Sequence, residues 1–142
     1  MLAKTKEKMV EFKNESDVRR WFKGRCEKME AEVFWVEAAS GGTQGLPDAI
    51  AVVGGHSFYA ELKVGTRNGK KMEFEMDNLQ RKTLRRLQKA GADVAILVGE
   101  KETGKVWAAK PDEIKVKPTN RKVTKVRGRC GHTIPLIEPS LD

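Results

Sequence analysis

The segment GLPDAIAVVGGHSFYAELK, Gly45–Lys63, constrains the fold of this chain more than any other feature of its sequence. Two runs rich in β-branched and aromatic residues, Asp48–Val53 and Ser57–Val64, flank the dipeptide Gly54-Gly55. A Gly-Gly pair suits a tight hairpin turn, because both turn positions need positive φ. The segment therefore predicts two antiparallel strands joined by a two-residue turn.

This turn length predicts which residues face one another across the hairpin. Val53 lies opposite His56 and, counting outward, Asp48 falls opposite Glu61, with Cβ atoms about 4.5–5.5 Å apart. A four-residue loop would place Asp48 opposite Lys63 and keep the same shared face. Along the second strand, alternation separates a charged face from an apolar face that we expect to join the core. The charged face carries Tyr59, Glu61 and Lys63, and the apolar face carries Phe58, Ala60, Leu62 and Val64.

Two carboxylates held this close repel each other unless one is protonated or both share a cation. Oxygen ligands of this kind suit Mg²⁺ or Mn²⁺, with water and a substrate phosphate completing the octahedron. Such a metal polarises a phosphodiester and lowers the pKa of a bound water. Lys63, on the same face as Glu61, can orient that water or stabilise charge on the phosphate. Whether Lys63 is itself the general base stays open, because its ordinary pKa of about 10.4 is far above neutrality.

The pattern G-x-P-D, then 12 residues, then E-L-K resembles the PD-(D/E)xK nuclease superfamily. The match is closest to its VRR-NUC branch, which is similar to Holliday-junction resolvases, and it covers Glu15 to about Val98. The resemblance implies a restriction-endonuclease-like αβββαβ core, in which helices flank a mixed central sheet. It also implies a Mg²⁺-dependent endonuclease that hydrolyses DNA, prefers branched or four-way junction DNA and acts as a homodimer.

The same resemblance implies further site residues. Glu15 would be a metal ligand on the first helix, Leu62 a ligand through its backbone carbonyl, and Gln80 a catalytic residue that contacts the metal-bound water or Lys63. Spacing supports two of them, because Glu15 and Gln80 stand at helical spacing from apolar residues and so face inward. Glu11 is the rival of Glu15, which can also be a simple helix-start acid. Gln80 can equally be a satisfied structural amide.

Periodicity places the remaining elements, in the order αβββαββ, within one domain that spans residues 1–142. The nuclease core covers about residues 15–110, and residues 111–142 form a basic C-terminal extension. The strand after the second helix is expected to be parallel to an earlier strand, and the last strand is expected at the edge of the sheet. The expected elements are helices Glu15–Met29 and Asp77–Ala90, and strands Glu32–Ala38, Ala92–Gly99 and Gly104–Lys110.

The chain is basic, with a formal net charge of +8 and a pI near 9.6, which favours a polyanionic partner such as nucleic acid. The phosphate-contact candidates are Arg19 and Arg20 on the first helix and Lys122, Lys125 and Arg127 in the extension. Charged residues on the outer face of an amphipathic helix are usually only solvated. For Arg19 and Arg20 this interpretation therefore stands beside phosphate binding.

The chain is expected to be soluble and intracellular, in the cytoplasm of its own cell or of a host. Cys26 and Cys130 make no disulfide framework, and neither a signal peptide nor an apolar run of about 20 residues is present. Two alternatives to a structure-specific endonuclease stay open. One is an inactive nucleic-acid-binding module of the same fold, and the other is a restriction or repair nuclease with another DNA substrate.

Overall fold

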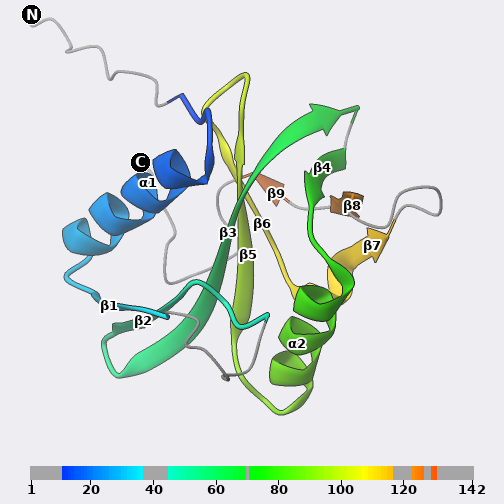
Figure 1. Ribbon diagram of the computed structural model, residues 1–142. Coiled ribbons are helices and arrows are strands. Elements are labelled where there is room, and N and C mark those ends of the chain that lie inside the picture. Colours follow the sequence, from blue (N-terminus) through cyan, green and yellow to red (C-terminus); the bar gives the residue numbers. More distant parts are fainter. Residues whose placement is uncertain (1–10, 37–44, 70, 117–122, 127–128, 131–142) are drawn as a thin grey trace, which may run out of the picture.

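A computed structural model describes residues 11–36, 45–69, 71–116, 123–126 and 129–130, with the backbone alone after residue 115. Its centre is a mixed sheet of nine strands, with helix α1 (Glu15–Lys28) on one face and helix α2 (Asn78–Lys89) on the other (Figure 1). The expected α/β architecture, a mixed sheet with flanking helices, is confirmed. In the part of the chain described, no helix is long and apolar enough to cross a membrane.

Helix α1 begins at Glu15, where the sequence predicts, and Asn14 is its N-cap. The Asn14 side chain accepts a hydrogen bond from the amide of Asp17 at 3.1 Å. Val18, Phe22 and Cys26, spaced by four residues, are all buried against the sheet. This stripe fixes the face that α1 turns to the core.

The predicted hairpin consists of β2 (Ala49–Val53) and β3 (His56–Asn68), joined by Gly54 and Gly55 with φ of 58° and 79°. Val53 pairs with His56, and the ladder continues outward to the pair Ala49–Ala60, which confirms the two-residue turn. On its outer side β2 pairs antiparallel with β1 (Glu32–Trp35). Strand β1 is shorter than expected, and residues 37 and 38 of the predicted strand lie outside the described residues.

Strand β3 lies at the centre of the sheet, and its two edges pair with different numbers of strands. Along one edge it pairs in parallel with β5 (Val94–Glu100), which confirms the predicted crossover through α2. Along the other edge β2 pairs with residues 56–60, and β4 (Lys71–Glu75) pairs with residues 65–68. Between them, residues 61–64 have no strand on that edge among the described elements. The sheet forks here, and we call this stretch the fork.

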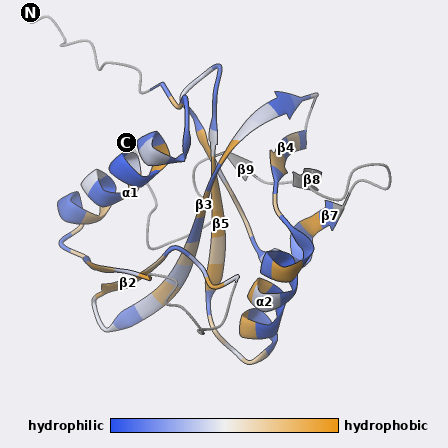
Figure 2. Ribbon diagram, viewed as in Figure 1, coloured by the Kyte–Doolittle hydropathy of each residue, from blue (hydrophilic) through white to orange (hydrophobic). Residues whose placement is uncertain are grey.

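Each face of the sheet has its own hydrophobic core. Phe12, Val18 and Phe22 pack with Leu62 and Leu97 on the α1 face. Leu84 of α2 packs with Ile96, Val98, Met72 and Phe74 on the other face. Strand β5 is buried along its whole length and is coloured mainly as hydrophobic in Figure 2. Both faces are thus covered, so the side chains of Tyr59 and Glu61 lie on the α2 side of the sheet rather than on an open surface.

The sheet has more strands than the expected order αβββαββ provides. Strand β3 runs past Val64 to Asn68 and returns as β4, which that order lacks. Strand β6 (Val106–Ala109) pairs with β5, but the expectation that it lies at the edge of the sheet is wrong, since β9 (Arg129–Cys130) pairs along its other side. Within the extension, the short 3-10 helix η1 (Pro111–Glu113) leads to β7 (Ile114–Val116). Strands β7 and β8 (Val123–Val126) then extend the sheet beyond β4.

Candidate active site

Asp48 lies in a bend one residue before β2, where the hairpin ladder has ended. Its carbonyl accepts a hydrogen bond from the amide of Val36, the residue after β1, at 2.8 Å, which holds its backbone. Its Oδ2 accepts a hydrogen bond from the amide of Leu62 at 2.9 Å. Asp48 is therefore not a ladder partner of Glu61, as was expected. Its side chain reaches into the fork instead and caps the amide of Leu62, the residue after Glu61.

The Leu62 amide also locates the carbonyl of the same residue. In an extended strand the N–H and C=O of one residue point to the same edge. Because the Leu62 amide meets Asp48 at the fork, the Leu62 carbonyl also points into the fork, where no described strand pairs with it. A carboxylate and a backbone carbonyl thus face one small gap in the sheet.

Glu61 is the most deeply buried acid of the site, with 2% of its surface exposed. Its Oε2 accepts a hydrogen bond from Gln80 Nε2 at 2.7 Å and lies 3.5 Å from Lys63 Nζ. Its Oε1 is buried and has no hydrogen-bond partner. A buried carboxylate oxygen without a partner is costly, so this atom marks a place that a cation or donor would stabilise.

Burial, the negative charge of Asp48 and, less strongly, that of Glu15 together raise the pKa of Glu61 to about 8, although the positive charge of Lys63 lowers it. Without a metal the folded protein therefore favours the protonated form of Glu61 at neutral pH. A bound cation would favour the ionised form.

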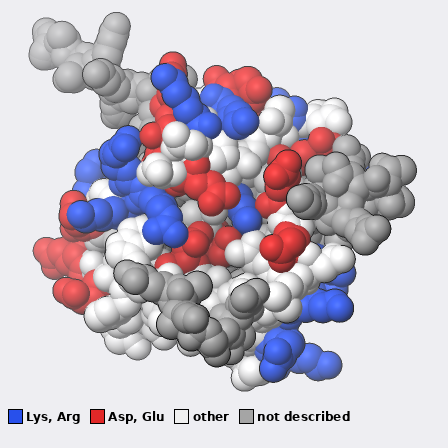
Figure 3. Space-filling view, in the orientation of Figure 1, with Lys and Arg blue, Asp and Glu red and all other residues white. Residues whose placement is uncertain are grey.

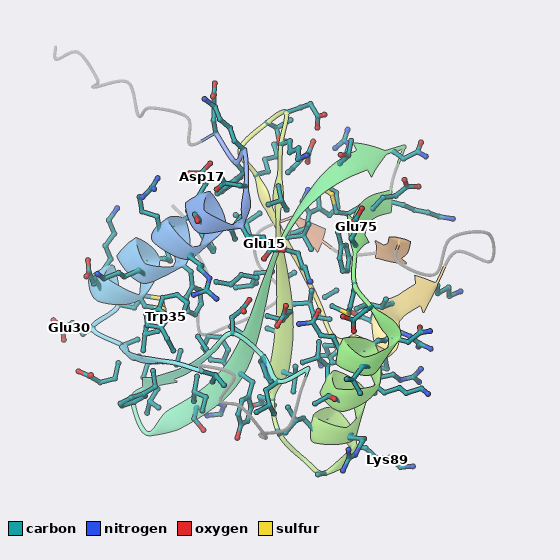
Figure 4. All side chains as sticks on the ribbon, viewed as in Figure 1. Glu15, Asp17, Glu30, Trp35, Glu75 and Lys89 are labelled. Atoms are coloured by element: carbon teal, nitrogen blue, oxygen red, sulfur yellow. The ribbon has the colours of Figure 1, made fainter. Side chains whose placement is uncertain are left out.

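Lys63 lies on the same face as Glu61, as predicted, and only 12% of its side chain is exposed. Its Nζ is 4.0 Å from Oε2 of Glu15 in addition to its contact with Glu61. Glu15 itself is 53% exposed, so the expectation that it lies on the buried stripe of α1 is wrong. Glu15 is the first residue of the helix, and its carboxylate reaches the site from the rim, near the middle of the face in Figure 4. The rival residue Glu11 is exposed and precedes the helix.

Gln80 reaches the site from the first turn of α2, which Asp77 caps by accepting a hydrogen bond from the Gln80 amide at 2.8 Å. The side chain is half-buried and faces inward, as its spacing predicts. Its hydrogen-bond partner is Glu61, and not Lys63 as one expectation had it. The Gln80 side chain is thus an amide with a hydrogen-bond partner, and that partner is a candidate site residue, so the two expectations for Gln80 do not exclude each other.

Arg19 makes a contact with Asp48 that spacing did not predict. Its guanidinium lies 3.1 Å from Asp48 Oδ1 and 5.0 Å from the ring centroid of Trp35. Arg19 follows Glu15 by four residues and so shares its side of α1, but this spacing does not itself specify the contact with Asp48. Arg20, the second expected phosphate contact on this helix, pairs with Asp17 at 3.2 Å.

Of the phosphate contacts expected in the extension, Lys125 alone lies within the described residues. Lys125 lies in β8, opposite Glu73 of β4 in the ladder, where only its backbone is described. Lys122 and Arg127 lie outside the described residues.

These positions determine whether the site can hold a metal ion. In the described ranges no group of three or more His, Cys, Asp or Glu side chains could hold a metal ion, so Glu15 does not complete a cluster with Asp48 and Glu61. Mg²⁺, however, commonly binds through one or two carboxylates and takes its other ligands from water and substrate phosphate. Asp48, the orphaned Oε1 of Glu61 and the Leu62 carbonyl supply such a partial set of hard oxygen donors. The residues present fit a divalent cation of this kind.

The surface around the site is divided by charge. Acidic side chains gather near the centre of the face drawn in Figure 3, with basic side chains on the α1 side and at the foot of α2. A groove of about 470 Å³ runs from Glu15 to the β3–β4 hairpin and is lined by both acids and lysines, among them Glu73, Glu75, Lys13 and Lys101. Basic flanks around an acidic centre suit a polyanion that crosses the site.

Comparison with solved structures shows that the chain has the restriction-endonuclease-like fold. The structure of Hjc, a Holliday junction resolvase from the archaeal hyperthermophile Archaeoglobus fulgidus, matches with a TM-score of 0.57 and 15% identity, covering 79% of this chain and 87% of that chain. A bacterial homing endonuclease, I-Ssp6803I, matches with a TM-score of 0.47 and 11% identity over 69% of this chain and 63% of its own. No protein-family model and no curated protein sequence matches the chain. The likeness to Hjc is one of fold.

Proposed function

We propose that this chain is a Mg²⁺-dependent endonuclease that hydrolyses DNA phosphodiester bonds. The observation that carries the proposal is the orphaned, buried Oε1 of Glu61, in a carboxyl group whose Oε2 lies 3.5 Å from Lys63 and whose strand neighbour Leu62 is capped by Asp48. Burying an ionised carboxylate without a full set of partners costs several kcal/mol, so the ionised form of Glu61 favours a bound cation. The PD-x₁₂-ELK motif and the fold shared with a Holliday junction resolvase point to the same chemistry.

Asp48, Glu61 and the Leu62 carbonyl would hold the metal, with Glu15 joining from the rim through water. When bound, the metal supplies Lewis acidity toward the scissile phosphate and acidifies a water. Lys63, held by Glu61 and Glu15, places an ammonium where negative charge develops on the phosphate. Gln80 fixes the orientation of Glu61, so that Oε1 rather than Oε2 faces the open position.

The DNA backbone would be bound by the basic flanks, for which Arg19, Arg20, Lys122, Lys125 and Arg127 are the candidates. Branched or four-way junction DNA is the proposed substrate, since Hjc, with the same fold, is a Holliday junction resolvase. Cutting two symmetric strands needs two sites, so a homodimer is part of this proposal. The proposal also includes membership of the VRR-NUC branch, which the motif supports. It includes an intracellular location, which the cysteine usage supports.

The test is cleavage of linear duplex, single-stranded, flap and four-way junction DNA in Mg²⁺, Mn²⁺ or EDTA. We expect metal-dependent cutting, strongest on the junction, that falls at least 100-fold in Asp48→Ala and Lys63→Ala. Asp93→Ala is the matched control, because it removes an exposed carboxylate that pairs with His56 away from the site. Cutting in EDTA, or full activity of Asp48→Ala, contradicts the mechanism. Tight junction binding without any cutting by the native chain would instead identify an inactive binding module.

A further inference from the structure

Both carboxylate oxygens of Asp48 are engaged by donors of the chain itself. Oδ2 accepts the Leu62 amide, and Oδ1 faces the Arg19 guanidinium at 3.1 Å. The two contacts differ in kind, because the amide belongs to the backbone of the central strand, whereas Arg19 is 44% exposed on a long side chain. Only the Arg19 contact can open without moving the sheet.

Arg19 is also held from a second direction. Its guanidinium carbon lies 5.0 Å from the centroid of the Trp35 ring, within the range of a cation–π contact. The indole packs edge-on against Phe22 in the α1 core at 6.1 Å and is labelled below α1 in Figure 4. A fixed aromatic surface thus keeps the positive charge of Arg19 beside the site rather than free in solvent.

We propose that Arg19 is an internal counter-ion, which occupies the cation position on Asp48 Oδ1 in the metal-free protein and is displaced when a divalent ion binds. This inference rests on the proposed function. A singly charged guanidinium satisfies Asp48 alone and leaves Glu61 Oε1 without a partner. A divalent ion at the fork satisfies both carboxylates, so it outcompetes the guanidinium.

Arg19 thereby sets the metal concentration at which the site loads. Without it, Oδ1 of Asp48 would lose its ion pair and the site would bind an available cation more readily. With it, each binding event must first break the contact between Arg19 and Asp48. The apparent metal affinity is lowered by the strength of this contact, in the way that any competing equilibrium lowers an affinity.

The test is the affinity for Mn²⁺ alone, measured by calorimetry on the full chain without DNA. We expect Arg19→Ala and Arg19→Gln to bind Mn²⁺ about threefold to fivefold more tightly than the native chain, the upper part of the range of an exposed ion pair. Lys23→Ala is the matched control, because it removes one positive charge from the exposed side of the same helix and touches neither carboxylate. We expect it to stay within about twofold of the native affinity.

The outcomes separate this inference from the proposed function. If Asp48→Asn abolishes Mn²⁺ binding while Arg19→Ala binds no more tightly than Lys23→Ala, the counter-ion role is wrong and the metal site stands. If the native chain binds no Mn²⁺, both are wrong. A second readout is the Nε–Hε resonance of Arg19 in NMR spectra, which should shift as Mg²⁺ is added. An Arg19 resonance that does not move at saturating Mg²⁺ also overturns the counter-ion role.

Discussion

Gln80 donates a hydrogen bond from Nε2 to Oε2 of Glu61 at 2.7 Å, and this contact joins the first turn of α2 to the middle of β3. The same oxygen lies 3.5 Å from Lys63 Nζ, whereas the other oxygen has no partner. Two donors on one oxygen orient the carboxylate, so the amide of Gln80 helps to decide which oxygen is left without a partner.

We predict that Gln80→Ala lowers Mg²⁺-dependent cleavage about 10-fold to 100-fold, as loss of a partner that orients a ligand typically does. The loss should be partly recovered at high Mg²⁺, because the reoriented carboxylate binds metal more weakly rather than not at all. The measurement is the cleavage rate as a function of Mg²⁺ concentration.

Gln88→Ala provides the control for this prediction. Gln88 lies two turns later on α2, and its side chain exchanges hydrogen bonds of 3.2 and 3.3 Å with Asp112 outside the site. Its loss should leave the Mg²⁺ dependence as it is in the native chain. A Gln80→Ala chain that also keeps the native Mg²⁺ dependence would mean that the amide is only structural.

Glu61 should make the metal-free protein less stable as pH rises. Its pKa is about 8 in the folded chain against an ordinary value of 4.5, so between about pH 5 and 8 the unfolded chain has lost a proton that the folded chain keeps. Ionisation therefore favours unfolding, and the free energy of unfolding should fall by up to about 1.4 kcal/mol per pH unit in this window. The measurement is urea unfolding in EDTA across this range.

Glu61→Gln should remove most of that slope, since an amide does not titrate. Glu27→Gln, which alters an exposed acid on α1, should keep it. Because a cation favours the ionised carboxylate, stabilisation by Mg²⁺ should grow from pH 5 to pH 8. An equal slope in Glu61→Gln and the native chain would show that other groups govern the pH dependence.

The parts of the site that lie on regular elements could be predicted from the sequence. The turn at Gly54-Gly55 fixes the register of β2 and β3, and alternation then places Glu61 and Lys63 together. Helical spacing brings Gln80 inward in the same way. These predictions hold because strand and helix periods are set by backbone geometry and need no knowledge of the tertiary fold.

The parts that depend on where an element ends could not be predicted. Counting residues places Asp48 opposite Glu61, but the ladder stops at Ala49 and the side chain of Asp48 turns to the Leu62 amide. Spacing from Val18 places Glu15 inward, yet a first-turn residue lies at the rim because no further turn precedes it. The pair of Arg19 and Asp48 joins residues 29 positions apart, and no local pattern specifies such a contact.

Gly45 lies where the loop before Asp48 passes the first turns of α2. Its φ is +83°, and a Cβ there would lie 2.9 Å from Thr83 Oγ1, 3.0 Å from Gln80 Cα and 3.1 Å from the Leu79 carbonyl. Two of these atoms belong to the helix backbone, which cannot move aside as a flexible side chain would. The loop that carries Asp48 can thus pack closely against the helix that carries Gln80 because residue 45 has no side chain.

Gly45→Ala should therefore lower the free energy of unfolding by about 1–3 kcal/mol, because it adds both a strained backbone conformation and a contact with α2. It should also weaken Mn²⁺ binding, since relief of the contact moves the Asp48 loop away from Glu61. Gly24→Ala is the matched control: it lies inside α1 with no atom within 4 Å of the added Cβ, so it should stabilise the chain by about 0.5–1 kcal/mol. Urea unfolding of the native chain, Gly45→Ala and Gly24→Ala measures the changes in stability, and calorimetry measures Mn²⁺ binding. A Gly45→Ala chain as stable as the native one would show that the loop can leave α2 without cost, and the close packing of the two site segments would then not be what holds Asp48 near Glu61.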